Sequence, residues 1–392
     1  MRAYLLDSLN NSEIRMEILV LFNLFTKSTT FYKIVNRVVN MNNIEIFSKR
    51  LKNARIMKGL SMDSLVKAMG NSVSKMTISK YENCKLSPSS TVLIELSKAL
   101  EMPIDYFFRP FTQKIDSIKF RKNNSNLSVK VENSIKESVF DFIERYRYIE
   151  EICDSSVTFD YALKSLVSKD EDVIEAAYSL REIWNIGEDG IVNVIELLEE
   201  RGVKVLEMDL PNSLDGLSAV VNEIYPVVIL NVKMPSERKR FTALHELGHL
   251  ILTFASSVLE KEEERFCNIF ASEMLIPDAV FKIKLGTSRH DISYLELWAI
   301  QVQYGISPDA LMYKAKSSGI INEERYRSFC IQKNRNERFK DIIEQSLYPK
   351  EKSYRFQSLV YKALSNELIS ISKAATLLSQ SVEQVRENFI LI

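Results

Sequence analysis

Three features of the sequence predict a mainly α-helical protein with a small β-sheet, an α+β fold. Glycine and proline are scarce, at 10 and 9 of 392 residues, so the chain has few tight turns. Leucine, glutamate and lysine are abundant, and these residues favour helices. Strand-like alternation is concentrated in residues 202–231, where it predicts a compact sheet. A chain of this length with 46% hydrophobic residues can supply the cores of two or three domains.

Residues 47–110 read as five short helices. Ser61 and Ser74 are suited to cap the second and third of them. The third helix is polar and basic on its outer side, and its apolar residues recur on one face. Residues 44–110 carry eleven Lys/Arg against six Asp/Glu, in a chain whose overall net charge is zero. Two short helices joined by a tight turn, the second of them basic, are typical of a helix-turn-helix.

The segments 51–55, 77–82 and 87–89 resemble the helix-turn-helix domain of the XRE (Cro/C1-type) repressor family. The resemblance implies that the third helix enters the major groove of a double-stranded DNA operator, and that the protein binds as a homodimer. The residues expected to face bases or phosphates are Lys75, Met76, Thr77, Ser79, Lys80, Asn83 and Lys85. The alternative is a small helical bundle with a solvated basic face and no role on DNA.

The sequence departs from the repressor family just after the third helix. The family usually has a glycine at this position, where this chain has Cys84. Asparagine tolerates the left-handed backbone conformation better than most residues do, so we expect Asn83 to make the turn.

The segments on either side of the helix-turn-helix, which spans 44–110, have weaker patterns. Residues 1–43 form an N-terminal extension with two interpretations: an additional docking helix, or a stretch that precedes a translation start at Met41. Residues 111–158 read as a helical connector that begins with a short strand or extended arm at 117–122. Within the connector, residues 128–152 form an amphipathic helix whose apolar face needs a partner.

Residues 161–202 read as three helices, and a three-stranded sheet follows them. The strands are expected at 202–208, 217–221 and 226–231. An edge strand of such a sheet can pair with an extended peptide substrate. The alternative is that all three strands are covered and belong only to the core.

His245, Glu246 and His249 form a His-Glu-x-x-His motif within an apolar, helix-forming run. Residues four apart lie on one face of a helix, so the two imidazoles can bind one ion. Two histidines, a third ligand and a water make a catalytic zinc site. The chain has only 3 histidines, so a chance match is uncommon. The alternative is a helix whose histidines happen to lie four residues apart.

The segments 240–249, 264–271 and 273–277 look like the ImmA/IrrE family of zinc metallopeptidases, and further similarity extends back to 215–218 and forward to 306–311. The resemblance implies a gluzincin-type Zn²⁺ site with a defined composition. Its members are the ligands His245, His249 and Glu264, the catalytic residue Glu246, and Asn268 as a hydrogen-bonding neighbour of the ligands.

The third zinc ligand has alternatives on the same acidic helix. Glu263 and Glu273 are the fallbacks to Glu264. Glu264 can also be read as part of a solvated run of charge at 260–264. His290, the remaining histidine, reads as a surface-loop residue.

The downstream boundaries and the compartment follow from similar observations. Residues 159–320 are expected to form the metallopeptidase domain, and residues 321–392 a C-terminal helical module. The four cysteines lack the spacing of a disulfide framework or a thiolate metal site. No apolar stretch in the sequence is long enough to span a bilayer. We therefore expect a cytoplasmic protein with no membrane partner.

These features together predict a DNA-binding zinc endopeptidase that regulates transcription by cleaving a repressor or another regulatory protein. The substrate class follows from the family resemblance alone. Glu246 would take a proton from water and pass it to the leaving amine. The alternative is a non-proteolytic XRE-type regulator or antitoxin whose metallopeptidase-like domain senses a ligand or partner, and a third interpretation is a defence component that acts on phage or toxin proteins. The intact Glu246 favours the peptidase.

Overall fold

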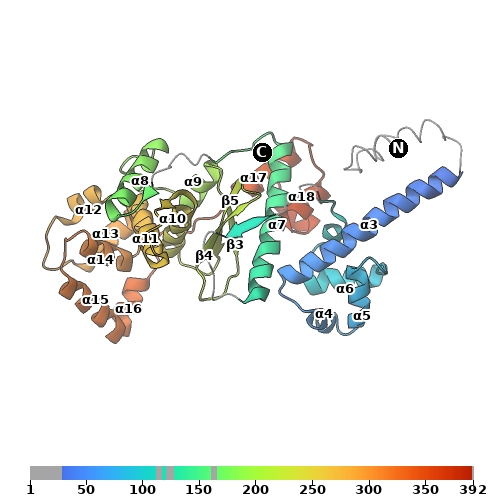
Figure 1. The fold of residues 1–392 in the computed structure, drawn as a ribbon, viewed down its shortest axis with the longest axis horizontal. Helices are drawn as coiled ribbons and strands as arrows, with labels where there is room; N and C mark the ends of the chain where they lie inside the picture. The colour runs from blue at the N-terminus through green and yellow to red at the C-terminus, as the bar shows by residue number, and fades with distance from the viewer. Residues whose placement is uncertain (1–28, 112–116, 121–127, 160–165, 391–392) are drawn as a thin grey trace. The chain divides into compact units, whose positions relative to one another are not determined.

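The computed structural model describes residues 29–111, 117–120, 128–159 and 166–390, with side chains from residue 43 onward (Figure 1). The chain divides into two compact units. The first contains Met1–Ile115, Asn126–Ser155 and Gln357–Ile392, and the second contains Asp116–Ser125 and Ser156–Phe356. Among the described helices, none is long and apolar enough to cross a membrane.

Serine caps define the helix-turn-helix part of the first unit. Its elements are α3 (Thr29–Met57), α4 (Met62–Ala68), α5 (Lys75–Glu82), α6 (Ser90–Leu100) and a 3₁₀ turn (Ile104–Phe108). Ser61 and Ser74 each accept a hydrogen bond from the backbone N–H of the third residue of α4 and α5, Ser64 and Thr77, which confirms both predicted caps. Leu65, Ile78 and Leu96 are fully buried and hold α4, α5 and α6 in one core.

The first helix is longer than the sequence led us to expect. Helix α3 begins at Thr29 and runs without a break to Met57, so the end of the expected N-terminal extension and the first repressor-type helix are one element. Residues 1–28 of that extension lie outside the described residues.

A long helix and the C-terminal helices join the same unit. Helix α7 (Val129–Ile152) matches the predicted amphipathic helix, and its Ser134 hydroxyl donates to the Met57 carbonyl oxygen (2.5 Å). The buried Arg50 of α3 donates to Glu144 of α7 at 2.7 Å. The unit also contains α17 (Arg355–Ser365) from Gln357 onward, α18 (Ile371–Leu378) and α19 (Val382–Asn388).

These contacts change the interpretation of the expected connector and C-terminal module. The apolar face of α7 finds its partners inside the helix-turn-helix unit, where Val139 and Ile143 are fully buried. On α7, Arg145 donates to the carbonyl oxygen of Leu377 in α18 (2.5 Å). This hydrogen bond links α7 to α18, and the last helices belong to the same compact unit as α7.

A four-stranded sheet forms the centre of the second unit. The three predicted strands are present as β3 (Lys204–Met208), β4 (Gly216–Val221) and β5 (Tyr225–Asn231). A fourth strand, β1 (Ile118–Phe120), pairs antiparallel with β4. The order is β1-β4-β5-β3, with β4 and β5 antiparallel and β3 and β5 parallel. The sequence left residues 117–122 as a short strand or an extended arm; residues 118–120 form the strand, and it joins the sheet that was expected to have three strands.

Two of the three helices expected before the sheet are described, α8 (Asp170–Ile183) and α9 (Val194–Glu200). Residues 160–165, at the start of that region, lie outside the described residues. Two short strands, β2 (Leu166–Val167) and β6 (Thr253–Phe254), pair in parallel and form a separate two-stranded sheet.

The helices that follow the sheet build the rest of the unit. Helix α10 (Ser236–Ile251) packs on β4 and β5, and α11 (Glu260–Leu275) packs on α10 and α8 (Figure 1). At Gly248 of α10, an added Cβ would lie 3.3 Å from the Cys267 sulfur and from the Phe270 ring of α11. The remaining helices are α12 (Asp278–Leu285), α13 (Tyr294–Tyr304), α14 (Pro308–Ser317), α15 (Glu323–Arg335) and α16 (Glu337–Glu344).

Candidate metal centre and DNA-reading helix

A buried carboxylate anchors the first turn of α10, the helix that carries the histidine motif. Glu237 accepts hydrogen bonds from the Ser346 hydroxyl (2.5 Å) and from the backbone N–H of Leu347 (2.7 Å). It also accepts one from the amide of Gln301 (2.8 Å). Burial raises the pKa of the Glu237 carboxyl, but these hydrogen bonds outweigh burial and hold the pKa below its usual value.

A buried ion pair holds the second turn of α10. Arg240 is fully buried and pairs with Glu351, whose other carboxylate oxygen accepts the backbone N–H of Val194 (3.0 Å). Arg240 also donates to the carbonyl oxygens of Ile191 (2.6 Å) and Tyr304 (3.2 Å). Burial raises the pKa of the Glu351 carboxyl, and Arg240 opposes that shift without cancelling it. The segment after α16 thus clamps α10 from outside the helix.

Three potential ligand atoms converge between α10 and α11. The Nε2 atoms of His245 and His249 lie 3.2 Å apart. The Oε2 atom of Glu264 lies 3.5 Å from Nε2 of His245, and its Oε1 atom lies 3.2 Å from Nε2 of His249. Among the described residues, His245, His249 and Glu264 form the one cluster of His, Cys, Asp or Glu side chains that could hold a metal ion.

The spacing of these atoms matches the needs of a zinc ion. Four-coordinate zinc, with bonds of about 2.0–2.2 Å to imidazole nitrogen and carboxylate oxygen, separates neighbouring ligand atoms by about 3.3–3.5 Å. The two imidazole nitrogens, 3.2 Å apart, fall close to this range, and each of them has one oxygen of the Glu264 carboxylate at a similar distance, 3.5 Å for His245 and 3.2 Å for His249. Two imidazoles and one carboxylate are also the donor set of many catalytic zinc sites. The residues present therefore fit a zinc ion.

Asn268 contacts the ring nitrogen of His245 that does not face the cluster. Its side-chain oxygen lies 3.0 Å from Nδ1 of His245. When Nδ1 donates to this oxygen, Nε2 keeps its lone pair for a metal. Asn268 lies one turn after Glu264 on α11, so one helix face supplies both a ligand and the group that orients another ligand.

The carboxylate of Glu246 is placed by a residue from the sheet. Glu246 is buried, and its Oε2 atom accepts a hydrogen bond from the Ser218 hydroxyl at 2.7 Å. Ser218 lies on β4, where a Cβ added at the neighbouring Gly216 would be 2.7 Å from the Thr242 methyl group. The sequence contained the segment 215–218 as part of the family resemblance, but no local pattern assigned Ser218 to Glu246.

The other acidic and histidine candidates lie outside the cluster. Glu273 forms a buried ion pair with Lys314 and accepts the backbone N–H of Asp278 (2.9 Å). Among the described residues, the metal-binding group includes neither Glu273 nor Glu263. The side chain of His290 is 99% exposed, so it has the surface position expected from the sequence.

Helix α5 presents most of the residues expected on DNA. Only Ile78 and Tyr81 of its eight residues are buried, and Met76 is 68% exposed. Lys75 pairs with Asp63 at 2.7 Å, with both side chains largely in solvent. The remaining expected contacts are distributed as follows: Lys80, Asn83 and Lys85 are exposed, and Thr77 and Ser79 are partly buried.

The turn after α5 differs from the expectation. Asn83 has φ −105°, and Cys84 is the residue with positive φ, at 58°. The N–H of Lys85 bonds to the Lys80 carbonyl and that of Cys84 to the Tyr81 carbonyl, which is the Schellman pattern. The left-handed residue of this pattern lies one position beyond the helix cap, so the missing glycine cannot be replaced by the preceding asparagine.

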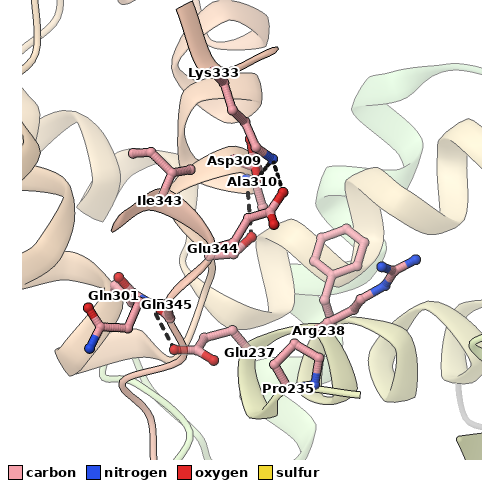
Figure 2. Close-up of a pocket in the computed structure, with 12 residues that line it drawn as sticks. Pro235, Glu237, Arg238, Gln301, Asp309, Ala310, Lys333, Ile343, Glu344 and Gln345 are labelled. Carbon is pink, nitrogen blue, oxygen red and sulfur yellow. Dashed lines mark hydrogen bonds and ion pairs between the residues drawn. The ribbon is translucent and has the colours of Figure 1, made fainter. Parts of the chain in front are cut away.

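A cavity of about 640 Å³ lies at the N-terminal half of α10 (Figure 2). Figure 2 shows Lys333 between Asp309 and Glu344, and its Nζ lies 2.6 and 3.0 Å from their carboxylates. Glu237 on the opposite side is hydrogen-bonded to Gln301. These charges are satisfied within the protein, and the cavity lining does not include the metal cluster.

Two family models match the chain. Residues 198–316, which contain the metal cluster, match the IrrE N-terminal-like domain of peptidase family M78. Residues 51–107, which contain α5, match a helix-turn-helix domain. No curated protein sequence matches the chain. The fusion expected from the sequence, an XRE-type domain followed by an ImmA/IrrE-type metallopeptidase domain, is confirmed.

Proposed function

We propose that this fusion of a helix-turn-helix domain with an IrrE-like metallopeptidase domain is a zinc endopeptidase that cleaves a repressor or another DNA-associated regulatory protein. The observation that carries the proposal is the convergence of His245, His249 and Glu264 to within 3.5 Å of one another, beside the buried Glu246. The helix-turn-helix supports a regulatory substrate, because it would concentrate the peptidase at sites where regulators bind.

The residues of the site have separable roles. His245, His249 and Glu264 would hold the zinc ion, and Asn268 would fix the orientation of His245. When bound, zinc supplies Lewis-acid chemistry that acidifies water and polarises a carbonyl. Glu246 would accept the proton from water and return it to the leaving nitrogen. The hydrogen bond from Ser218 holds one oxygen of that carboxylate, which sets the direction of the other.

The first test measures zinc content by elemental analysis of the purified full-length chain. We expect about one zinc per chain. His249→Ala should lose most of it, because one of three protein ligands is removed. His290→Ala is the matched control, since this exposed histidine lies outside the cluster and its variant should retain the metal. Equal zinc content in both variants would remove the assignment of the site.

The second test measures cleavage of candidate repressors encoded near the gene. Glu246→Gln should retain zinc and slow cleavage by about 100-fold to 10,000-fold, the usual contribution of a general base. Stoichiometric zinc without cleavage of any candidate, together with unchanged promoter repression in Glu246→Gln, would instead favour a non-proteolytic regulator whose metallopeptidase-like domain senses a ligand or partner.

A further inference from the structure

A second, smaller cavity begins beside the metal cluster. It has a volume of about 260 Å³, and Asn268, the hydrogen-bond partner of His245, is part of its wall. One turn before His245 on α10 comes Phe241, and one turn after Asn268 on α11 comes Ser272, and both also line it. The cavity is therefore lined by residues that lie one helical turn along α10 and α11 from His245 and its partner Asn268.

The wall of this cavity is mainly apolar. Phe241 and Ile269 line it from α10 and α11, and Ala310 and Tyr313 close it from α14. Phe241, Ile269 and Ala310 pack against the core but are only partly buried, and Tyr313 is exposed, so all four keep some surface accessible to solvent. An apolar surface of this kind gains free energy when it is covered by another apolar group.

The two charged residues that line the cavity are paired with each other. Lys314 and Glu273 form a buried ion pair, and both side chains are less than 7% exposed. Glu273 also accepts the backbone N–H of Asp278. Because these charges already have partners, the cavity offers no free counter-charge to an ionised ligand, and burying a charge without one is costly.

The size of the cavity indicates what fills it. Sites for whole small-molecule ligands usually measure about 300–1,000 Å³. The value of 260 Å³ falls just below that range and suits one medium or large side chain. Consecutive Cα atoms are about 3.8 Å apart, so a peptide whose scissile bond lies at the metal ligands can place the adjacent side chain one helical turn away.

We infer that this cavity binds the uncharged apolar side chain, such as that of leucine, of the substrate residue next to the scissile bond. This inference rests on the proposed endopeptidase function. It assigns substrate selection at that position to Phe241, Ile269, Ala310 and Tyr313, none of which belongs to the proposed catalytic group.

The experiment measures binding of small hydroxamates to the zinc-loaded full-length chain by calorimetry. One pair, N-acetyl-leucine and N-acetyl-glycine hydroxamate, places the side chain before the metal-binding group. A second pair, isobutyl-substituted and unsubstituted succinyl hydroxamate, places it after that group. In at least one pair the isobutyl compound should bind about tenfold to 100-fold tighter, as expected for burial of one leucine side chain.

Variants test whether the higher affinity of the isobutyl compounds arises in this cavity. Ala310→Phe should fill the cavity and remove most of the isobutyl advantage, while the unsubstituted compounds still bind and so report an intact site. Ala299→Phe is the matched control, because Ala299 is exposed on α13 and outside the cavity lining. Tyr313→Ala, at a side chain that is 44% exposed, should reduce the advantage severalfold without filling the cavity.

Equal affinities within both pairs, or an isobutyl advantage that survives Ala310→Phe, would overturn the inference while leaving the endopeptidase proposal in place. Failure of every hydroxamate to bind a chain that also fails to retain zinc would overturn both.

Discussion

Helix α5 leaves most of its residues at least partly accessible to solvent, whereas helix α10 buries most of its residues. In α5, two of eight residues are buried, and Lys75, Met76 and Lys80 are exposed. In α10, thirteen of sixteen residues are buried, and its charged side chains at positions 237, 240 and 246 are hydrogen-bonded within the protein. A surface that reads a partner needs side chains free to contact it, whereas a site that holds a metal and a base needs fixed geometry.

The difference also determines how each helix is held. Helix α5 is anchored by two apolar residues and by the pair of Glu82 with Arg55 of α3 (2.6 Å). Helix α10 is clamped by the segment around Glu351 and by close packing at Gly248. Substitutions on α5 should therefore affect binding more than folding, and substitutions on α10 should often affect both.

The largest effect is expected when the clamp on α10 is removed. Arg240→Ala leaves Glu351 buried without its cation, and loss of one partner of a buried pair costs about 3–5 kcal/mol in free energy of unfolding. Urea denaturation measures this change. Arg238→Ala is the matched control, because Arg238 is 62% exposed on the same helix and its pair with Asp215 is expected to contribute about 1 kcal/mol or less.

The loss in free energy of unfolding caused by Arg240→Ala should depend on pH. Burial already raises the pKa of Glu351, and without Arg240 nothing of equal strength opposes burial. A carboxyl whose folded pKa exceeds its unfolded pKa destabilises the fold while it is ionised. The deficit should therefore shrink as the pH falls through the raised pKa towards about 4.3, the unfolded value for glutamate. Similar losses for Arg240→Ala and Arg238→Ala at all pH values would contradict the contrast between buried clamp and exposed surface.

A smaller effect, on binding alone, is expected from the lysines of α5. Lys75→Ala combined with Lys80→Ala should weaken operator binding by about tenfold to 100-fold at physiological salt. It should also lower the slope of log affinity against log salt by about 2, since each lost phosphate contact contributes about 0.9. The operator can be selected from random duplex DNA and binding measured by fluorescence anisotropy.

The matched control for the α5 lysines removes the same charge elsewhere in the unit. Lys49 and Lys98 are exposed on α3 and α6, outside the residues expected on DNA. Their double alanine variant should keep most of the affinity and of the salt slope. Unchanged binding in the α5 variant, or equal losses in both variants, would remove the assignment of α5 as the reading helix.

A modest effect on catalysis is expected from Ser218→Ala. It removes the hydrogen bond that orients Glu246, so kcat for peptide cleavage should fall about threefold to 30-fold, with KM and zinc content little changed. Ser318→Ala is the matched control, because Ser318 also donates to a carboxylate, that of Asp278, away from the metal cluster. If both variants lose activity equally, the role of Ser218 is general stability rather than the position of Glu246.

The smallest effect is expected at the turn after α5. Cys84→Gly should raise the free energy of unfolding by about 0.5–1 kcal/mol, because glycine adopts positive φ without the steric cost of a Cβ atom. Asn83→Gly is the control, since φ at Asn83 is negative and glycine there only adds unfolded-state freedom. Thermal denaturation measures both, and stabilisation by Asn83→Gly instead would contradict the observed turn.

Local features could be predicted because their causes are local. The serine caps at Ser61 and Ser74, the three strands β3 to β5 and the pairing of His245 with His249 on one helix face depend on neighbours within a few residues. The repressor-like and IrrE-like segments were recognisable for the same reason, since their characteristic residues lie close together in the chain.

The family resemblance had already selected Glu264 on α11, but the physical reason for that choice is the packing of two helices. Glu263, Glu264 and Glu273 are chemically equivalent in the sequence, but their directions around α11 differ. The angle at which α11 meets α10 brings Glu264 to the imidazoles and leaves Glu273 beside Lys314. The partnership of Ser218 with Glu246 likewise depends on how the sheet meets α10.

What the sequence by itself determined is the chemistry available: a polar helix with two exposed lysines, two histidines and a glutamate on one helix, and acidic residues nearby. What only the tertiary structure decided is which distant groups meet: β1 in the sheet, α7 and the last helices with the helix-turn-helix, and Glu351 on Arg240. The physical reason is that local order follows from backbone preferences and side-chain period, whereas long-range contacts follow from the burial of surfaces whose partners lie many residues away.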